Sequence, residues 1–368
     1  MASPNRQHSG AGGVHSTQRP TRLLIKQTLR TNRSQFMIGN SGAIGVIGAG
    51  VTGSRVVEHF VATSSTSILL HDQDLYLAQR LAAVHQSHRA AVSVVDFETV
   101  AMASVVVLAS GSPHAPIAQK LLDHGASVVS LSDDVTDVMN LLKMHDEVVA
   151  KNKTLVVGAA ASPGMTGLLL SNLMSNFDEI DEAHVALHGT GGPNCAVQHH
   201  RALAGQSIGW HDGEWLRRPG GSGRELCWFP EPVGAYDCYR AEMADPVLLK
   251  RAQPQLQRIT ARVSANRRDR FTARLPMLVP PHAEGGMGAL RIEVRGFRNG
   301  SRIVEIAGVA ERVAQIAGVV GATTALFVHR GQITTTGTCV LGQDSLPNAE
   351  ILRDVLTGGI RLHQFVGT

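Results

Sequence analysis

Residues 43–72 read as a strand, a glycine-rich turn, a helix and a second strand followed by an acid. Residues 43–47 form a short apolar run, as expected of a buried parallel strand. Three glycines then follow with the spacing G-x-G-x-x-G, namely Gly48, Gly50 and Gly53. In that spacing the first glycine permits a tight turn, the second lets the backbone approach a pyrophosphate, and the third lets helix and strand pack closely. The stretch therefore predicts that the first half of the chain binds a dinucleotide.

The residues around the turn extend this prediction. The N–H groups and positive dipole end of a helix at 51–62 would face the phosphates. Asp72 follows the second apolar run and can accept hydrogen bonds from ribose hydroxyls, which favours NAD over NADP. Two alternatives leave NADP open. A one-residue shift of the strand end would put Gln73 or Asp74 at this position, and His71 and Arg80 could help to bind a 2′-phosphate. The predicted cofactor-binding residues are Gly48, Gly50, Val51, Thr52, Gly53, Asp72, Ser110 and Gly111.

The alternation of strands and helices continues beyond Asp72. We expect strands at 43–47, 67–70, 92–95, 104–108, 127–131 and 154–157, and hence a doubly wound parallel (Rossmann) α/β sheet with right-handed crossovers. Ligands of such sheets lie outside the carboxyl ends of the strands. Three loops, at 110–113, 130–134 and 162–164, are therefore expected around the nicotinamide and the substrate.

The later part of the chain has a different pattern of apolar and polar residues. Residues 184–187 and 290–295 alternate as strands of a half-exposed sheet should. Between them, residues 188–239 look irregular, and a long segment of this kind is usually functional when it holds tryptophans and cysteines. Small residues along a predicted helix at 309–328 would allow close packing on the dinucleotide-binding half. We expect a disordered basic tail at 1–40, a Rossmann domain at 41–165, an inserted α/β (α+β) substrate domain at 166–305, and a C-terminal helix and strand at 306–368 packing back on the Rossmann domain.

The composition excludes several classes of protein. The formal charge of +4 arises in residues 1–42, which hold six basic residues and no acid; the remainder has 28 basic against 30 acidic residues. A near-neutral folded part gives no reason to expect nucleic acid. No apolar run reaches the roughly 18 residues of a membrane helix. Four cysteines without a C-x-x-C pair favour a reducing cytoplasm over a disulfide framework.

Three segments resemble the saccharopine dehydrogenase-like family, particularly its compact bacterial members. They are GVIGAGVTGS at 45–54, GAAASPGMTGLLLSNL at 158–173 and LPNAEILRDVLTGGIRLHQF at 346–365. The resemblance spans residues 43–366. It implies a Rossmann domain, an interrupting α/β domain joined to it by the proline-glycine turn at 162–166, and NAD(P)-dependent redox chemistry at a carbon–nitrogen bond.

Reactive side chains gather at 189–205. Cys195, His199, His200 and Arg201 follow a Gly-Gly-Pro turn and are expected on a short helix. A histidine can exchange a proton as hydride moves, so His199 and His200 are candidate catalytic residues. Cys195 and His199 are four residues apart and could form a thiolate pair, although a packing role for Cys195 is the alternative. No third ligand lies at a suitable spacing, so no metal site is predicted.

A second cluster surrounds a glycine-rich loop at 219–223. Arginine pairs with carboxylates in bidentate fashion, so Arg218 and Arg224 are candidate clamps for a substrate carboxylate. A solvated loop or a phosphate site would use the same residue types.

Together these features predict an NAD(P)-dependent oxidoreductase, with NAD favoured. It would transfer hydride at a C–N or C–O carbon of a small, carboxylated, amino-acid-like metabolite, and it could form a homodimer. The alternative is a non-catalytic NAD(P)-binding redox sensor or scaffold, because the glycine turn would serve both. A flavoprotein would need a second flavin-contact motif, which the sequence lacks.

Overall fold

The computed structural model describes residues 42–86, 90–277 and 280–365. The predicted disordered tail at 1–40 lies outside the described residues. All described elements belong to the compact unit that spans residues 41–368.

The first part of this unit alternates strands with helices. Its elements are β1 (Ile44–Ile47), α3 (Val51–Thr63), β2 (Ile68–His71), α4 (Leu75–Val84), β3 (Val92–Val94), α5 (Phe97–Val100), β4 (Val105–Leu108), α6 (Ala115–Asp123), β5 (Ser127–Ser130), α7 (Val135–Lys143), α8 (His145–Ala150) and β6 (Thr154–Val157).

These strands and β15 (Gly337–Cys339) form a seven-stranded parallel sheet in the order β15-β6-β5-β4-β1-β2-β3. All four residues of β1, β4 and β6 are buried, as expected when helices cover both faces. The predicted doubly wound parallel sheet is confirmed. The seventh strand was not predicted, because it comes from the far C-terminal part of the sequence and is three residues long.

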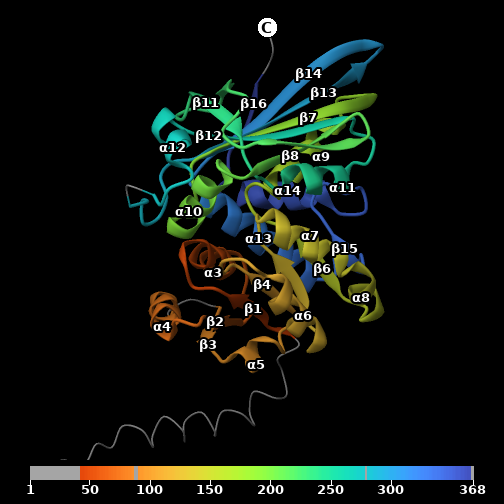
Figure 1. The fold of residues 1–368 in the computed structure, drawn as a ribbon. Coiled ribbons are helices and arrows are strands. Elements are labelled where there is room, and N and C mark those ends of the chain that lie inside the picture. Colours follow the sequence, from red (N-terminus) through yellow and green to blue (C-terminus); the bar gives the residue numbers. More distant parts are fainter. Residues whose placement is uncertain (1–41, 87–89, 278–279, 366–368) are drawn as a thin grey trace, which may run out of the picture. The chain divides into compact units, whose positions relative to one another are not determined.

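The second part builds a mixed nine-stranded sheet (Figure 1). Its elements are α9 (Met165–Met174), β7 (Glu179–His188), α10 (Pro193–Ala202), β8 (Gln206–His211), β9 (Glu214–Pro219), β10 (Glu225–Trp228), β11 (Ala235–Arg240), α11 (Asp245–Ala252), β12 (Arg258–Ser264), α12 (Arg267–Thr272), β13 (Ala289–Arg298), β14 (Ser301–Ala310), α13 (Val313–His329), α14 (Asn348–Thr357) and β16 (Leu362–Phe365).

The strand order of this sheet is β10-β11-β12-β7-β13-β14-β16, with β8 pairing β12 and β9. Only β7 and β12 run parallel among the described pairs of this sheet; the other pairs are antiparallel. β16 pairs with β14, so the last strand belongs to the second sheet, whereas the sequence predicted that it packs on the Rossmann domain.

The prediction of an irregular segment at 188–239 is wrong. This stretch holds α10 and four strands, and β8 and β9 form a hairpin. The hairpin turns at Asp212 and Gly213, whose φ angles of 48° and 95° suit the tight turns that join antiparallel strands. The strands escaped detection because β9 exposes most of its residues and therefore lacks apolar alternation.

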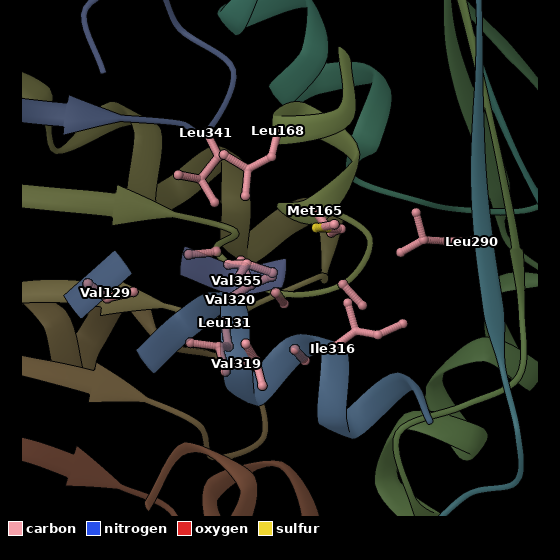
Figure 2. Packing of buried hydrophobic residues seen from close by; sticks show 14 of the residues in the cluster. Val129, Leu131, Met165, Leu168, Leu290, Ile316, Val319, Val320, Leu341 and Val355 are labelled. Atoms are coloured by element: carbon pink, nitrogen blue, oxygen red, sulfur yellow. The ribbon is translucent and has the colours of Figure 1, made fainter. Parts of the chain in front are cut away.

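One buried cluster joins the two sheets through α13. Figure 2 shows Ile316, Val319 and Val320 of this helix between Val129 of β5 and Leu290 of β13. Each such buried aliphatic side chain contributes about 1.5–3 kcal/mol. Helix α13 also packs on α3, where a Cβ added at Gly318 would lie 2.4 Å from Cβ of Arg55. Small residues therefore permit the close helix contact that the sequence predicted.

A buried carboxyl group supports the turn between the sheets. Asp245, at the start of α11, accepts hydrogen bonds from Ser162 Oγ and Thr166 Oγ1, both at 2.8 Å. Burial raises the pKa of Asp245 to about 6, although these two hydrogen bonds oppose the rise. Asp245 thus ties the proline-glycine turn to the second half.

This raised pKa predicts a pH-dependent stability. The ordinary pKa of the group is 3.8, so the folded state favours the protonated carboxyl, and its stabilisation is complete below pH 3.8 and lost as the pH rises through about 6. The stability of the natural chain relative to Asp245→Asn should fall by about 3 kcal/mol over that interval and stay flat above it. Denaturant unfolding of both proteins from pH 4 to pH 8 measures this difference. A difference that is constant or rises with pH would contradict the account.

Candidate functional site

A cavity of about 820 Å³ lies at the carboxyl ends of the parallel strands. Its walls come from the glycine turn, from the loops after β2, β4, β5 and β6, and from the starts of α10 and α13. Loops after successive parallel strands meet at one sheet edge, which is where such sheets bind ligands. The three loops predicted to surround a ligand each contribute lining residues.

Each glycine of the turn meets a different steric demand. Gly48 has φ +112°, and a Cβ there would lie 2.7 Å from the backbone of Ala109 and Ser110. A Cβ at Gly53 would lie 1.9 Å from the carbonyl oxygen of Gly48, so α3 starts directly against the turn. A Cβ at Gly50 would meet nothing within 4 Å, because this position faces the cavity. Only the middle glycine keeps space open for a ligand.

The first turn of α3 has the features of an anion site. Its N-cap is Gly50, no side chain caps it, and its first turn contains no acid. Val51 and Thr52 line the cavity beside it. Free N–H groups and the positive end of the helix dipole favour a phosphate there. The residues present therefore fit the pyrophosphate of a dinucleotide.

Asp72 links the glycine turn to the end of β2. Its Oδ2 accepts from the N–H of Ala49 at 2.6 Å, and its Oδ1 accepts from the N–H of Asp74 at 2.7 Å. The carboxylate also lines the cavity, with lone pairs left for further donors. Asp74 instead caps α4, accepting from the N–H groups of Tyr76 and Leu77. The two neighbouring acids thus have separate roles.

The loop after β4 offers a polar group to the same cavity. Ser110 Oγ is buried without a hydrogen-bond partner among the described residues, and Ser110 lines the cavity. An unsatisfied buried hydroxyl is costly unless a ligand satisfies it. A Cβ at Gly111 would meet nothing within 4 Å. Seven of the eight predicted cofactor-binding residues line the cavity; Gly53 shapes the turn from behind.

Three reactive side chains converge at the wall of the same cavity. Cys195 Sγ lies 3.6 Å from His199 Nε2, and Asp133 Oδ2 lies 3.8 Å from the same nitrogen. Gln198 Nε2 donates to the other oxygen of Asp133 at 2.7 Å and so fixes that carboxylate. Cys195 and His199 come from α10, and Asp133 comes from the loop after β5. All four residues line the cavity.

The surroundings of His199 favour its charged form. Burial lowers the pKa of the imidazole, but attraction to Cys195 and the contact with Asp133 outweigh this, so the pKa lies well above its usual value of 6.5. The cluster is thus an electrostatically coupled group facing the cavity.

Asp133 is a candidate functional residue that the sequence did not reveal. The sequence predicts a helix-capping cluster at 132–134, and Asp134 does cap α7 by accepting from the N–H of Asp137 at 2.8 Å. Its neighbour Asp133 is left to point into the cavity. The structure places this third possible ligand beside Cys195 and His199, and sequence spacing could not reveal it because Asp133 comes from a distant loop of the other half.

Three predicted catalytic residues lie outside the cavity. His200 is buried on the far side of α10, where its Nε2 lies 3.0 Å from the carbonyl oxygen of Thr272. Arg218 lies on β9 and is exposed. Arg224 pairs with Asp237 at 2.9 Å and stays largely exposed. Among the residues that the structure describes, no arginine lines the cavity, so the arginine clamp is not borne out.

No family model and no curated protein sequence matches the chain. Its structure is similar to apo saccharopine dehydrogenase (L-Glu forming) from Saccharomyces cerevisiae, with a TM-score of 0.66 and 13% identity over 88% of this chain and 100% of that one. C. glutamicum DAP dehydrogenase in complex with DAP aligns with a TM-score of 0.48 and 13% identity, over 87% of this chain and 99% of that one. The first likeness confirms the two-domain fold that the resemblance implied. Among the described residues, no helix combines the length and apolarity needed to cross a bilayer.

The glycine turn yields a direct prediction. Gly50 has φ −71°, which other residues adopt, and an added side chain would project into open space. Gly50→Val should therefore fold normally but fill the phosphate position, weakening NADH binding at least about 100-fold. Nicotinamide fluorescence titration measures the affinity.

Gly286→Val is the matched control. A Cβ there also meets nothing within 4 Å, and Gly286 does not line the cavity. Unchanged NADH affinity in a folded Gly50→Val protein would refute the assignment of the phosphate site.

Proposed function

We propose that the chain is an NAD(P)-dependent oxidoreductase acting on a small metabolite at a C–O or C–N carbon. The observation that carries this proposal is that one cavity is lined both by an anion-binding helix start and by the Asp133–Cys195–His199 cluster. A dinucleotide laid from one to the other would bring its reactive ring to reactive side chains.

The strand order supports this orientation. Asp72 and the cavity-lining Phe97 follow β2 and β3, at one edge of the sheet, and would hold the adenosine. Asp133 follows β5, on the opposite side of β1, and would lie near the nicotinamide. The bound cofactor would supply a hydride acceptor or donor. Ser110 would satisfy its buried hydroxyl against the cofactor.

The Asp133–Cys195–His199 cluster would act on the substrate. When hydride leaves or reaches a carbon, charge changes on the attached oxygen or nitrogen, and a positioned proton carrier stabilises that change. The Asp133–Cys195–His199 cluster occupies this position, and His199 would stabilise the changed charge either as a proton carrier or by holding a cation. The start of α10 has no side-chain cap, so its N–H groups could anchor a substrate carboxylate in place of the arginines first expected.

The role of His199 predicts a selective loss of turnover. His199→Ala should lower kcat by roughly 10²–10⁴-fold and leave NADH affinity within about twofold, because the residue contacts substrate rather than adenosine or phosphate. His200→Gln is the matched control, since His200 lies outside the cavity. Turnover is screened with alcohols, amino acids and keto acids by absorbance of the reduced nicotinamide.

The same screen distinguishes an enzyme from a non-catalytic sensor. Tight NADH binding without turnover of any substrate would favour a non-catalytic sensor. Equal turnover in the His199→Ala and natural proteins would remove His199 from the mechanism.

Asp72 supports a preference for NAD, because its carboxylate would repel a 2′-phosphate. NADH should bind about tenfold more tightly than NADPH, and Asp72→Asn should narrow that ratio by removing the charge while keeping an acceptor for the Ala49 N–H. Asp74→Asn removes a neighbouring charge but keeps a helix cap and should leave the ratio unchanged. Fluorescence titrations with both cofactors measure the ratio, and tighter NADPH binding to the natural chain would contradict this proposal.

A further inference from the structure

The Asp133–Cys195–His199 cluster in the cavity wall has the geometry of a metal site. Its three candidate ligand atoms, from Asp133, Cys195 and His199, all lie within 4.8 Å of one another. They are a carboxylate oxygen, a thiol sulfur and an imidazole nitrogen, which are the three donor types that zinc takes in proteins.

The direction of the contacts separates a metal site from a proton relay. In a relay, the acid and the nucleophile lie against different ring nitrogens of the histidine. Here Cys195 Sγ and Asp133 Oδ2 both face Nε2 of His199, at 3.6 Å and 3.8 Å. A single N–H cannot point at both atoms, whereas a cation between the three atoms would contact all of them.

The distances also fit a tetrahedral zinc ion. Zinc–sulfur and zinc–nitrogen bonds of about 2.3 Å and 2.0–2.1 Å separate the two donors by about 3.6 Å at a tetrahedral angle. The observed separation of Sγ and Nε2 is 3.6 Å. The carboxylate of Asp133 would move inward by about half an ångström to reach the corresponding nitrogen–oxygen separation.

The surroundings meet the other requirements of such a site. Gln198 donates to the second oxygen of Asp133 at 2.7 Å, which orients the carboxylate as outer-shell partners of metal ligands do. A thiolate and a carboxylate together balance the charge of a divalent cation. All three residues line the cavity, so a path for entry exists and a fourth position faces open space.

We propose that Asp133, Cys195 and His199 bind one Zn²⁺ ion whose open fourth position takes a hydroxyl or carbonyl oxygen of the substrate. Three protein ligands with an open position are the pattern of catalytic rather than structural zinc. The ion would polarise that oxygen as a Lewis acid. This assignment of a substrate oxygen rests on the proposed function, whereas the metal site rests on the geometry alone.

The test uses the full chain, stripped with a chelator and titrated with Zn²⁺ against a chromophoric chelator. We expect one equivalent to bind. Cys195→Ala, His199→Ala and Asp133→Asn should each weaken binding at least about 100-fold, and Gln198→Ala should weaken it by about 10–100-fold. Cys227→Ala is the matched control, because that cysteine is buried in the second sheet away from the cavity.

Substitution with Co²⁺ supplies a readout independent of activity. The natural chain should show a thiolate-to-cobalt charge-transfer band and the visible bands of tetrahedral cobalt. In Cys195→Ser the charge-transfer band should vanish and the visible bands should remain. Azide should shift the visible bands by occupying the open position. Circular dichroism identifies any variant that fails to fold, and Cys195→Ser and His199→Gln then replace the alanine variants.

The proposed metal site would be refuted if the chain did not bind metal stoichiometrically. It would also be refuted if Cys227→Ala and Cys195→Ala weakened zinc binding equally. Cobalt bands that do not respond to azide would overturn the open position. NADH titration of the metal-free chain keeps the two proposals separate. Metal binding without NADH binding would reject only the cofactor, and NADH binding without metal binding would reject only the zinc site.

Discussion

The contact between Gly53 and the carbonyl of Gly48 is the constraint on which the rest of the structure depends. A side chain at Gly53 would lie 1.9 Å from that oxygen, so α3 can begin directly after β1 only because this position is bare. The close start leaves the first N–H groups of α3 facing the cavity. Helix α13 packs on α3 through Gly318, and the buried cluster around α13 reaches Leu290 of the second sheet. The close contact between Gly48 and Gly53 thereby positions both the anion site at the start of α3 and helix α13, which joins the two halves.

The cavity combines two kinds of recognition. At the glycine turn the groups facing a ligand are backbone N–H groups, whose positions follow from the local strand–turn–helix geometry. In the Asp133–Cys195–His199 cluster they are side chains from separate halves of the chain. Cys195 and His199 come from α10, Asp133 comes from the loop after β5, and Gln198 of α10 donates to Asp133. Under the proposed function, the first arrangement would bind the cofactor and the second would bind the substrate, so cofactor binding and chemistry would use separate parts of the cavity.

The sequence predicted the first arrangement well, because its residues are neighbours and each has one steric reason to be glycine. It predicted the second poorly. Asp133 looks identical to the helix cap Asp134 in the sequence, and only the meeting of α10 with the loop after β5 distinguishes them. Arg218 and Arg224 carried suitable chemistry, but an exposed hairpin and a pair with Asp237 keep them away from the cavity. The short exposed strands at 206–240 lacked apolar alternation and were missed for that reason.

A crystal structure with NADH bound would test the central claim most directly. We expect the pyrophosphate to accept hydrogen bonds from the N–H groups at the start of α3, with the adenosine beside Asp72 and the nicotinamide directed toward Asp133 and α10. A pyrophosphate placed away from Gly50, or a nicotinamide directed toward β2, would contradict it.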